Sequence, residues 1–391
     1  MTDIQKENKS GGKVPNLRFP EFKEGWEVKK LGEISTNKSK KYNPNNETNF
    51  IKCIELEHLS SETGQLLGFV DGSQSGSIKN VFQKGDVLFG KLRPYLKKYY
   101  QPNFDGVCSS EIWVLNGKEI LNDFLYYLIQ TNSFVDLANQ SSGSKMPRAD
   151  WSILENGLFS FPNSEEQQKI ASFLSLIDER IQTQNKIIKE LKTLKASTAK
   201  KIFSQELRFK DDNGNDFPEW EVREVGEVFK ITRGNVLAMN LVSNQCNEKN
   251  TYPVYSSQTK NNGLAGYYTD FLFEDAITWT TDGANAGDVN YRSGKFYCTN
   301  VCGVLISNEG YANSCIAELI NSVSKNYVSY VGNPKLMNGV MSEIKIPFPS
   351  LPEQTKIANF LSAIDSKIDM ENQLLQKLEE QKKYLLQNMF V

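Results

Sequence analysis

Apolar residues recur every three and four positions through two long stretches of the chain, 164–203 and 351–391. A 3.5-residue apolar repeat sustained over about five heptads is typical of helices that wind around each other. We therefore predict one long helix in each stretch, roughly 60 Å in length at about 1.5 Å per residue. Ser164 and Ser350, each with a glutamate downstream, are the expected capping residues.

The two stretches are copies of one sequence. Residue 166 maps onto residue 353 and residue 178 onto residue 365, so the repeat has a shift of 187 residues. Shorter repeats accompany it, since Leu-Arg-Phe at 17–19 and Trp-Glu-Val at 26–28 return at 207–209 and 220–222. An internal repeat of this period predicts two copies of one unit, each a globular segment followed by a helix.

Two tandem units of this kind can pair their helices about a pseudo-two-fold axis, so we expect an antiparallel coiled coil within the chain. Polar residues interrupt the apolar stripe at the same two places in both helices, Gln184 with Glu371 and Lys195 with Lys382. Such interruptions lower stability and fix register. The alternative is that each helix pairs with another chain. The residues expected to hold the coil and dock partners are Ile170, Phe173, Leu174, Ile177, Ile181, Ile188, Leu191, Ile357, Phe360, Leu361, Ile364, Ile368, Leu375 and Leu378.

The globular segments read as mixed α/β (α+β), with short strands and many turns. Runs of β-branched and aromatic residues predict strands at 86–90, 112–115 and 301–306, and apolar periodicity predicts a helix at 122–137. The expected organisation is a disordered arm at 1–14, a globular domain at 15–163, a helix at 164–203, a second globular domain at 204–350 and a second helix at 351–391.

Composition sets limits on the class of protein. The chain has 391 residues, of which 39% are hydrophobic and 24% charged, and no apolar run reaches the length of about 18 residues that a membrane span needs. The first 13 residues are polar, unlike a signal peptide, and six irregularly spaced cysteines suit a reducing compartment, so we expect a cytoplasmic protein. A net charge of −2 argues mildly against nucleic acid as a partner, but a basic run from Lys79 to Tyr100 argues locally for it.

The residues that catalysis would require are sparse. His58 is the only histidine, and Cys298, Cys302 and Cys315 lack a fourth zinc ligand. The sequence contains no phosphate-binding G-x-x-x-x-G-K-Ser/Thr loop and no Asn-Pro-Pro-aromatic stretch of the kind found in amino-methyltransferases. We therefore expect a protein that binds and does not catalyse, with no metal and no cofactor of its own.

The motifs together resemble the specificity subunit of a Type I restriction-modification enzyme. The resemblance rests on Pro-Asn-Leu-Arg-Phe-Pro at 15–20, Gly-Asp-Val-Leu-Phe-Gly-Lys-Leu-Arg-Pro at 85–94, and both copies of the Glu-Gln-x-Lys-Ile-Ala-x-Phe-Leu-Ser-x-Ile-Asp helix. The second half adds Thr-Trp-Thr-Thr-Asp-Gly at 278–283 and Phe-Tyr-Cys-Thr-Asn-Val at 296–301.

The resemblance implies a target recognition domain in each globular segment, reading one half of a split, asymmetric DNA site, with the helices fixing the gap. It further implies assembly on double-stranded DNA with two methyltransferase subunits and two restriction subunits. S-adenosylmethionine, ATP and Mg²⁺ would then belong to those partners. A coiled-coil adaptor between two proteins, or an enzyme with cryptic motifs, are the competing hypotheses.

Residues for DNA contact are proposed from basic, aromatic and polar loop positions. In the first domain they are Lys91, Arg93, Tyr95, Lys97, Lys98, Lys145 and Arg148. In the second domain they are Thr281, Asp282, Asn285, Asn290, Arg292 and Lys295.

Overall fold

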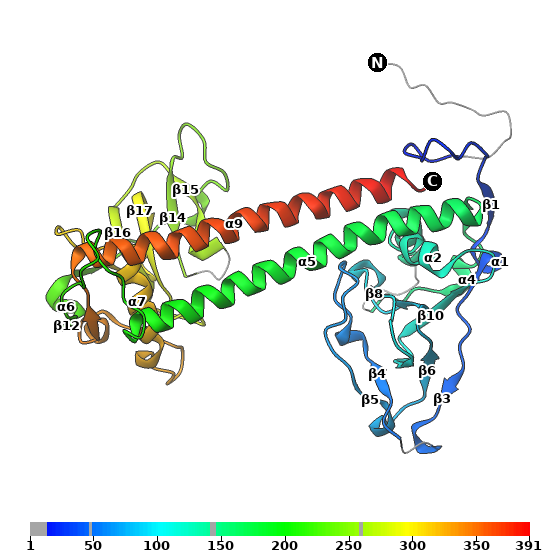
Figure 1. The fold of residues 1–391 in the computed structure, drawn as a ribbon, viewed down its shortest axis with the longest axis horizontal. Coiled ribbons are helices and arrows are strands. Elements are labelled where there is room, and N and C mark those ends of the chain that lie inside the picture. Colours follow the sequence, from blue (N-terminus) through cyan, green and yellow to red (C-terminus); the bar gives the residue numbers. More distant parts are fainter. Residues whose placement is uncertain (1–13, 47–48, 141–145, 258–260) are drawn as a thin grey trace. The chain divides into compact units, whose positions relative to one another are not determined.

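The two longest elements are helices α5 (Ser164–Phe203) and α9 (Leu351–Asn388), which coincide with the two predicted helical stretches (Figure 1). The computed structural model describes residues 14–46, 49–140, 146–257 and 261–391. It divides into two units, the first comprising Met1–Lys186 with Gln373–Val391 and the second Ile187–Asn372. Each unit therefore contains part of each long helix. The predicted arm at 1–14 lies outside the described residues except for Val14.

Within each unit the two helices run antiparallel, as predicted. In the first unit the beginning of α5 packs on the end of α9, and Lys382 pairs with Asp178 at 2.7 Å. In the second unit the end of α5 packs on the beginning of α9, and Lys195 pairs with Asp365 at 2.8 Å. These two ion pairs are equivalent under the 187-residue repeat. The lysine interruptions of the apolar stripe therefore pair with the partner helix of the same chain.

Most of the predicted seam is buried. The seam positions with less than a tenth of their surface exposed are Ile170, Leu174, Ile177, Ile188, Ile357, Leu361, Ile368 and Leu378, and Ile181, Leu191, Ile364 and Leu375 are half-buried. Phe173 and Phe360, expected to hold the coil and dock partners, lie off the seam. Phe173 packs edge-on against Phe19, with ring centroids 5.8 Å apart, and Phe360 packs against Phe209 at 5.5 Å. Both rings hold the segment that leads into their own globular part.

The predicted serine caps are also wrong. At the start of α5 the side chain of Asn163 accepts a hydrogen bond from the backbone N–H of Glu166 at 3.0 Å. The downstream glutamates face the entering segments, where Glu166 binds Arg18 and Glu353 binds Arg208. The buried hydroxyl of Ser350 has no hydrogen-bond partner among the described residues.

Three sheets form from the described residues of the first unit. A two-stranded antiparallel sheet pairs β1 (Glu27–Lys30) with β11 (Leu158–Phe161). The four-stranded sheet has the order β2 (Ser35–Thr36), β10 (Ile112–Gly117), β7 (Val87–Gly90), β8 (Tyr99–Tyr100). The five-stranded sheet has the order β3 (Lys41–Tyr42), β6 (Lys79–Phe82), β9 (Gly106–Cys108), β4 (Lys52–Ile54), β5 (Val70–Asp71). Its helices are α1 (Leu31–Ile34), α2 (Asn122–Leu128), α3 (Asn132–Ala138) and α4 (Trp151–Leu154).

The second unit repeats this plan with a more continuous sheet. β12 (Glu221–Glu224) pairs with β19 (Lys345–Phe348) as β1 does with β11. One six-stranded sheet has the order β13 (Lys230–Arg233), β18 (Cys302–Ile306), β16 (Phe273–Thr280), β17 (Val289–Cys298), β14 (Tyr252–Tyr255), β15 (Leu264–Tyr268). Its helices are α6 (Val225–Val228), α7 (Ser314–Ser324) and α8 (Asn338–Ser342).

One turn accounts for much of the difference between the two sheets. In the first unit the chain breaks between β6 and β7 at Gly85, whose φ is +87°. In the second unit β16 continues through the equivalent region with only a bulge at Asp275, whose φ is +46°. A bulge bends a strand without ending its pairing. The predicted strands are confirmed as β7, β10 and β18.

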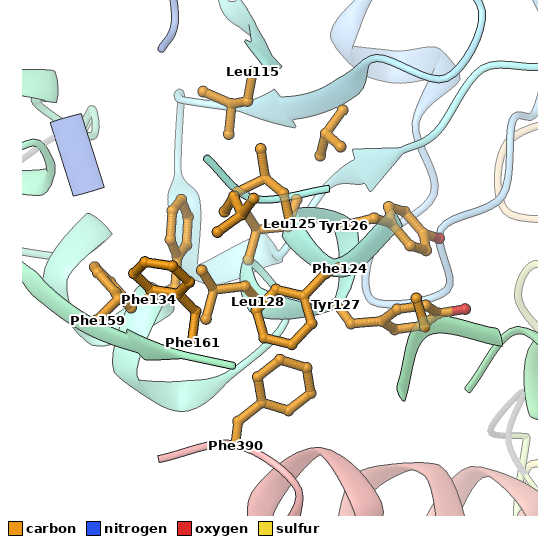
Figure 2. Close-up of a cluster of buried hydrophobic side chains, with 14 of the residues drawn as sticks. Leu115, Phe124, Leu125, Tyr126, Tyr127, Leu128, Phe134, Phe159, Phe161 and Phe390 are labelled. Atoms are coloured by element: carbon orange, nitrogen blue, oxygen red, sulfur yellow. The ribbon is translucent and has the colours of Figure 1, made fainter. Parts of the chain in front are cut away.

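The predicted helix at 122–137 is wrong as a single element. It forms two helices, α2 and α3, because the Thr131 side chain accepts a hydrogen bond from the N–H of Phe134 and starts a new helix. Both helices still bury their apolar residues in the first core. There Phe124 lies next to Phe390, which follows α9, with ring centroids 5.1 Å apart (Figure 2). Among the described residues no helix has the length and apolarity of a membrane span.

Candidate nucleic-acid interface

Two loop segments meet in the first unit at the end of β7. The backbone N–H of Arg93 donates to the carbonyl of Pro147 at 2.8 Å, and that of Ala149 donates to the carbonyl of Lys91 at 2.8 Å. A β-bridge between Leu92 and Arg148 lies between these bonds. We call residues 91–97 and 146–149 together the first junction.

The second unit contains the same arrangement at the end of β16. The N–H of Gly283 donates to the carbonyl of Pro334 at 3.0 Å, and that of Leu336 donates to the carbonyl of Thr281 at 2.9 Å. Asp282 and Lys335 form the intervening bridge. Residues 281–287 and 329–336 are the second junction. The two junctions therefore share one backbone framework but carry different side chains.

The first junction brings together several residues that the sequence proposed for DNA contact. Arg93 is exposed and has a φ of +53°, and Tyr95 is 51% exposed. Arg148 is exposed and pairs with Glu111 at 3.1 Å, while Lys91 is half-buried. A left-handed conformation is uncommon for arginine, so it is held by the flanking bonds to the facing segment.

The remaining first-domain candidates are Lys97, which is also part of the first junction, Lys98 and Lys145. Lys97 also has a positive φ, +47°, and lines a cavity of about 430 Å³ between the head of the first unit and its helices. Lys98 lies outside the first junction, and its amine donates to the carbonyl of Leu56 at 2.7 Å. Lys145 falls outside the described residues. Lys79, at the start of the basic run, is not available for DNA contact either, because it is 5% exposed and pairs with Glu55 at 2.6 Å.

The second junction corrects one prediction and adds one residue. Thr281 is fully buried, and its hydroxyl donates to Asp282 or the carbonyl of Val301, so it cannot reach a base edge. Lys335 is exposed and was missed. The sequence repeat could have identified Lys335, because the 187-residue shift that relates the two helices also aligns Pro147-Arg148 with Pro334-Lys335.

The other second-domain candidates divide between the junction and the neighbouring strand β17. Asp282 is half-buried beside Arg233 at 3.9 Å, and the amide of Asn285 donates to the carbonyl of Ser257 at 3.3 Å. Lys295 is exposed, with its amine 4.6 Å from the centre of the Phe271 ring. Asn290 and Arg292 line a separate cavity of about 250 Å³.

Buried polar groups near the end of β4 are structural. Burial alone would raise the pKa of Glu55, but hydrogen bonds and charge from Lys79 hold that pKa below its ordinary value. His58 uses its Nδ1 to accept a hydrogen bond from the N–H of Glu55 at 3.0 Å.

The cysteines considered as metal ligands are buried thiols. Burial raises the pKa of the Cys302 thiol to about 11 and that of Cys315 further still, which keeps both protonated. Among the described residues no group of three metal-binding side chains occurs.

The fold and the junctions define a class of protein, an internally duplicated chain with two equivalent loop junctions and an antiparallel helix pair. Residues 23–193 and 218–380 match the family described as "Type I restriction modification DNA specificity domain". The matches cover most of the chain, so it belongs to this family.

Relatives are similar over shorter stretches. A putative type I specificity subunit of Mycoplasma pneumoniae (S.MpnORF289P, N-terminus) is 40% identical over 141 residues, 35% of this chain and 74% of that protein. Another from the same organism (S.MpnORF615P) is 32% identical over 234 residues, 58% of this chain and 88% of that protein. The crystal structure of a Type-I restriction-modification system S subunit from M. genitalium is 19% identical, covers 97% of this chain and 99% of its own, and has a TM-score of 0.61. That likeness shows a shared fold.

Proposed function

We propose that this chain is the non-catalytic DNA sequence-specificity subunit of a Type I restriction-modification complex. Each unit reads one half of a bipartite, asymmetric DNA site. The helix pair sets the gap between the halves and docks the methyltransferase subunits. Family membership supports the general role, and the internal duplication supports the division of labour.

The observation that carries the proposal is the pair of junctions. Residues 91–97 read Lys-Leu-Arg-Pro-Tyr-Leu-Lys, whereas the equivalent residues 281–287 read Thr-Asp-Gly-Ala-Asn-Ala-Gly. Base edges in the major groove are distinguished by the donors and acceptors of the side chains that meet them. One framework with two different side-chain sets therefore suits two different half-sites, and identical sets would require a palindrome.

The helices support the spacing role. Asp178 pairs with Lys382, and Lys195 pairs with Asp365. The two pairs are seventeen residues apart on each helix, in opposite directions along the sequence. The two ion pairs thus require the same antiparallel register. On this proposal, a fixed helix register sets the distance between the two half-sites that are read, as the geometry of a dimer does for dimeric DNA-binding proteins.

Docking of partners would use the outer helix surface, since the seam is occupied. Leu176, Leu194 and Met370 are each more than half exposed on the helices. We propose two methyltransferase subunits on this surface and two restriction subunits beyond them. S-adenosylmethionine, ATP and Mg²⁺ would be bound by those partners.

The test exchanges one junction at a time. Replacing 281–287 and 329–336 with the corresponding loops of a relative, in cells that express the methyltransferase partner, should change one half of the methylated sequence. Exchange of 91–97 and 146–149 should change the other half, and sequencing of methylated DNA reads both outcomes. A change in both halves from one exchange would refute the division between units. Failure of the chain with its methyltransferase partner to bind DNA would favour the adaptor hypothesis.

A further inference from the structure

A buried cation lies in the second unit beside the 250 Å³ cavity. Arg292 is on β17 and is only 8% exposed. Its Nε donates to the hydroxyl of Thr278 at 3.1 Å and its Nη2 to the carbonyl of Asn262 at 2.7 Å. The guanidinium carbon lies 3.8 Å from the centre of the Tyr255 ring. These contacts fix the plane of the guanidinium.

The partners of Arg292 are all uncharged. No carboxylate bonds the guanidinium among the residues that the structure describes. Asp288 lines the same cavity but pairs with Lys325 at 2.8 Å. Burial lowers the pKa of Arg292, which reflects the cost of keeping this charge away from water. A buried charge is ordinarily paired, because desolvation without a counter-charge is unfavourable.

The first unit also buries a cation, Lys79 on the neighbouring strand β6, and there a carboxylate pairs with it. There the residue after β4 is Glu55, and it neutralises the buried Lys79. The strand pairings Ile54 with Cys108 and Tyr255 with Cys298 make Ser256 the equivalent of Glu55. The second unit therefore has a hydroxyl where the first has a carboxylate, and it has a cavity next to its cation.

The cavity suits a small anion with several acceptors. Ser256, Thr280 and Asn290 contribute hydroxyl and amide groups to its wall. Asn290 lies two residues from Arg292 on one strand, so both side chains project from the same face. An edge of a stacked base pair is recessed in its groove, whereas a backbone phosphate protrudes and can enter a recess of this size.

We propose that the Arg292 cavity binds a phosphate group of the DNA backbone and anchors the second unit on its half-site. This inference rests on the proposed function. It moves Arg292 from the predicted base-reading residues to the group that positions the protein without reading sequence.

The first test measures DNA binding by the full chain with its methyltransferase partner over a range of salt concentrations. Arg292→Gln should reduce the slope of log Kobs against log salt by about 1 and weaken cognate and unrelated duplexes by the same factor. Arg223→Gln is the control, because Arg223 is half-buried on β12, paired with Glu221 and not part of the cavity wall. Selective loss of cognate binding would show base reading and overturn the proposal, as would an unchanged slope.

A second variant guards against misfolding. Asn290→Asp places a carboxylate in the cavity wall and leaves Arg292 present. It should raise the melting temperature by supplying the missing counter-charge, and it should reduce the salt slope as Arg292→Gln does. Asn308→Asp adds the same charge at an exposed turn and should do neither. If Asn290→Asp binds DNA like the wild type, the cavity is not a phosphate site.

Adding inorganic phosphate tests anion binding in the Arg292 cavity independently of DNA recognition. It should raise the melting temperature of the wild-type chain more than that of Arg292→Gln. If this difference is seen while DNA binding is unaffected by either variant, the cavity takes free anions and the DNA assignment is wrong. If the wild-type complex binds DNA without sequence preference but the salt slope still depends on Arg292, the proposed function fails and the phosphate site stands.

Discussion

At the scale of single residues, the two units differ in how the buried glutamate near the start of each long helix is hydrogen-bonded. In the first unit Arg18 binds both carboxylate oxygens of the buried Glu166, at 2.7 Å each. The Nε1 of the equivalent tryptophan, Trp26, is then left with no partner among the described residues. In the second unit Trp220 Nε1 donates to Glu353 at 2.8 Å, and Arg208 shares the same carboxylate.

This difference predicts unequal effects of one substitution. Trp26→Phe and Trp220→Phe remove similar volumes, but only the second removes a hydrogen bond to a charged group. Trp220→Phe should therefore destabilise its unit by about 2 kcal/mol more than Trp26→Phe destabilises the other. Hydrogen exchange in β12 and β19, against β1 and β11, reports each unit separately. Equal losses of protection would contradict the assignment of the bond.

At the scale of elements, the long helices combine an apolar seam with an ion pair between α5 and α9 in each unit. Asp178 and Lys382 are only 18% and 11% exposed, and Asp178 also accepts a hydrogen bond from Tyr127 at 3.0 Å. A partly buried pair that is complete adds little net stability, but removing one partner leaves a charge without compensation. The pair therefore favours one register over others that would separate the charges.

We predict that Asp178→Ala lowers the stability of the first unit by about 2 kcal/mol, because the amine of Lys382 loses its counter-charge. The double exchange Asp178→Lys with Lys382→Asp should recover part of the loss, as judged by chemical denaturation. Glu21→Gln removes half of an exposed pair with Lys169 and should have a much smaller effect, because water and salt screen such a pair. A cost for Asp178→Ala as small as that control would remove the ion pair from the account of register.

At the scale of the whole molecule, the first unit is assembled from both ends of the chain. The N–H of Leu17 donates to the carbonyl of Asn388 at 2.8 Å, and Met389 and Phe390 are buried in the first core. In the second unit the corresponding bond runs from Leu207 to Lys201 within one continuous segment. The first unit therefore depends on two segments that lie far apart in the sequence.

This assembly predicts that Phe390→Ala lowers the stability of the first unit by about 3 kcal/mol, because a buried ring against Phe124 is lost. The second unit should keep its stability, since the ring contributes nothing to its core. Hydrogen exchange should show faster exchange in β7 and β10 and unchanged exchange in β16 and β17. Loss of protection in both sets would mean that the two units unfold as one.

Long, periodic elements were predicted well and irregular ones were not. The helices carry their pattern over many turns, so α5 and α9 and their antiparallel pairing followed from the stripe and its repeat. The break at Thr131 and the capping by Asn163 depend on single hydrogen bonds that several nearby polar residues could have made. Arg93 and Arg148 were chosen from local charge, and the sequence contained the shift that would also have given Lys335.

The sequence by itself determined the duplication and the two long helices, because a repeated 3.5-residue apolar stripe has to be buried against another helix. It left open whether that helix belongs to the same chain. Only the tertiary structure decided which basic and polar residues face outward. It turned Lys79, Lys98 and Thr281 inward, brought 91–97 against 146–149, and left Arg292 buried beside a cavity with no described carboxylate bonded to its guanidinium. Such outcomes depend on which distant segments meet, and local composition does not encode that.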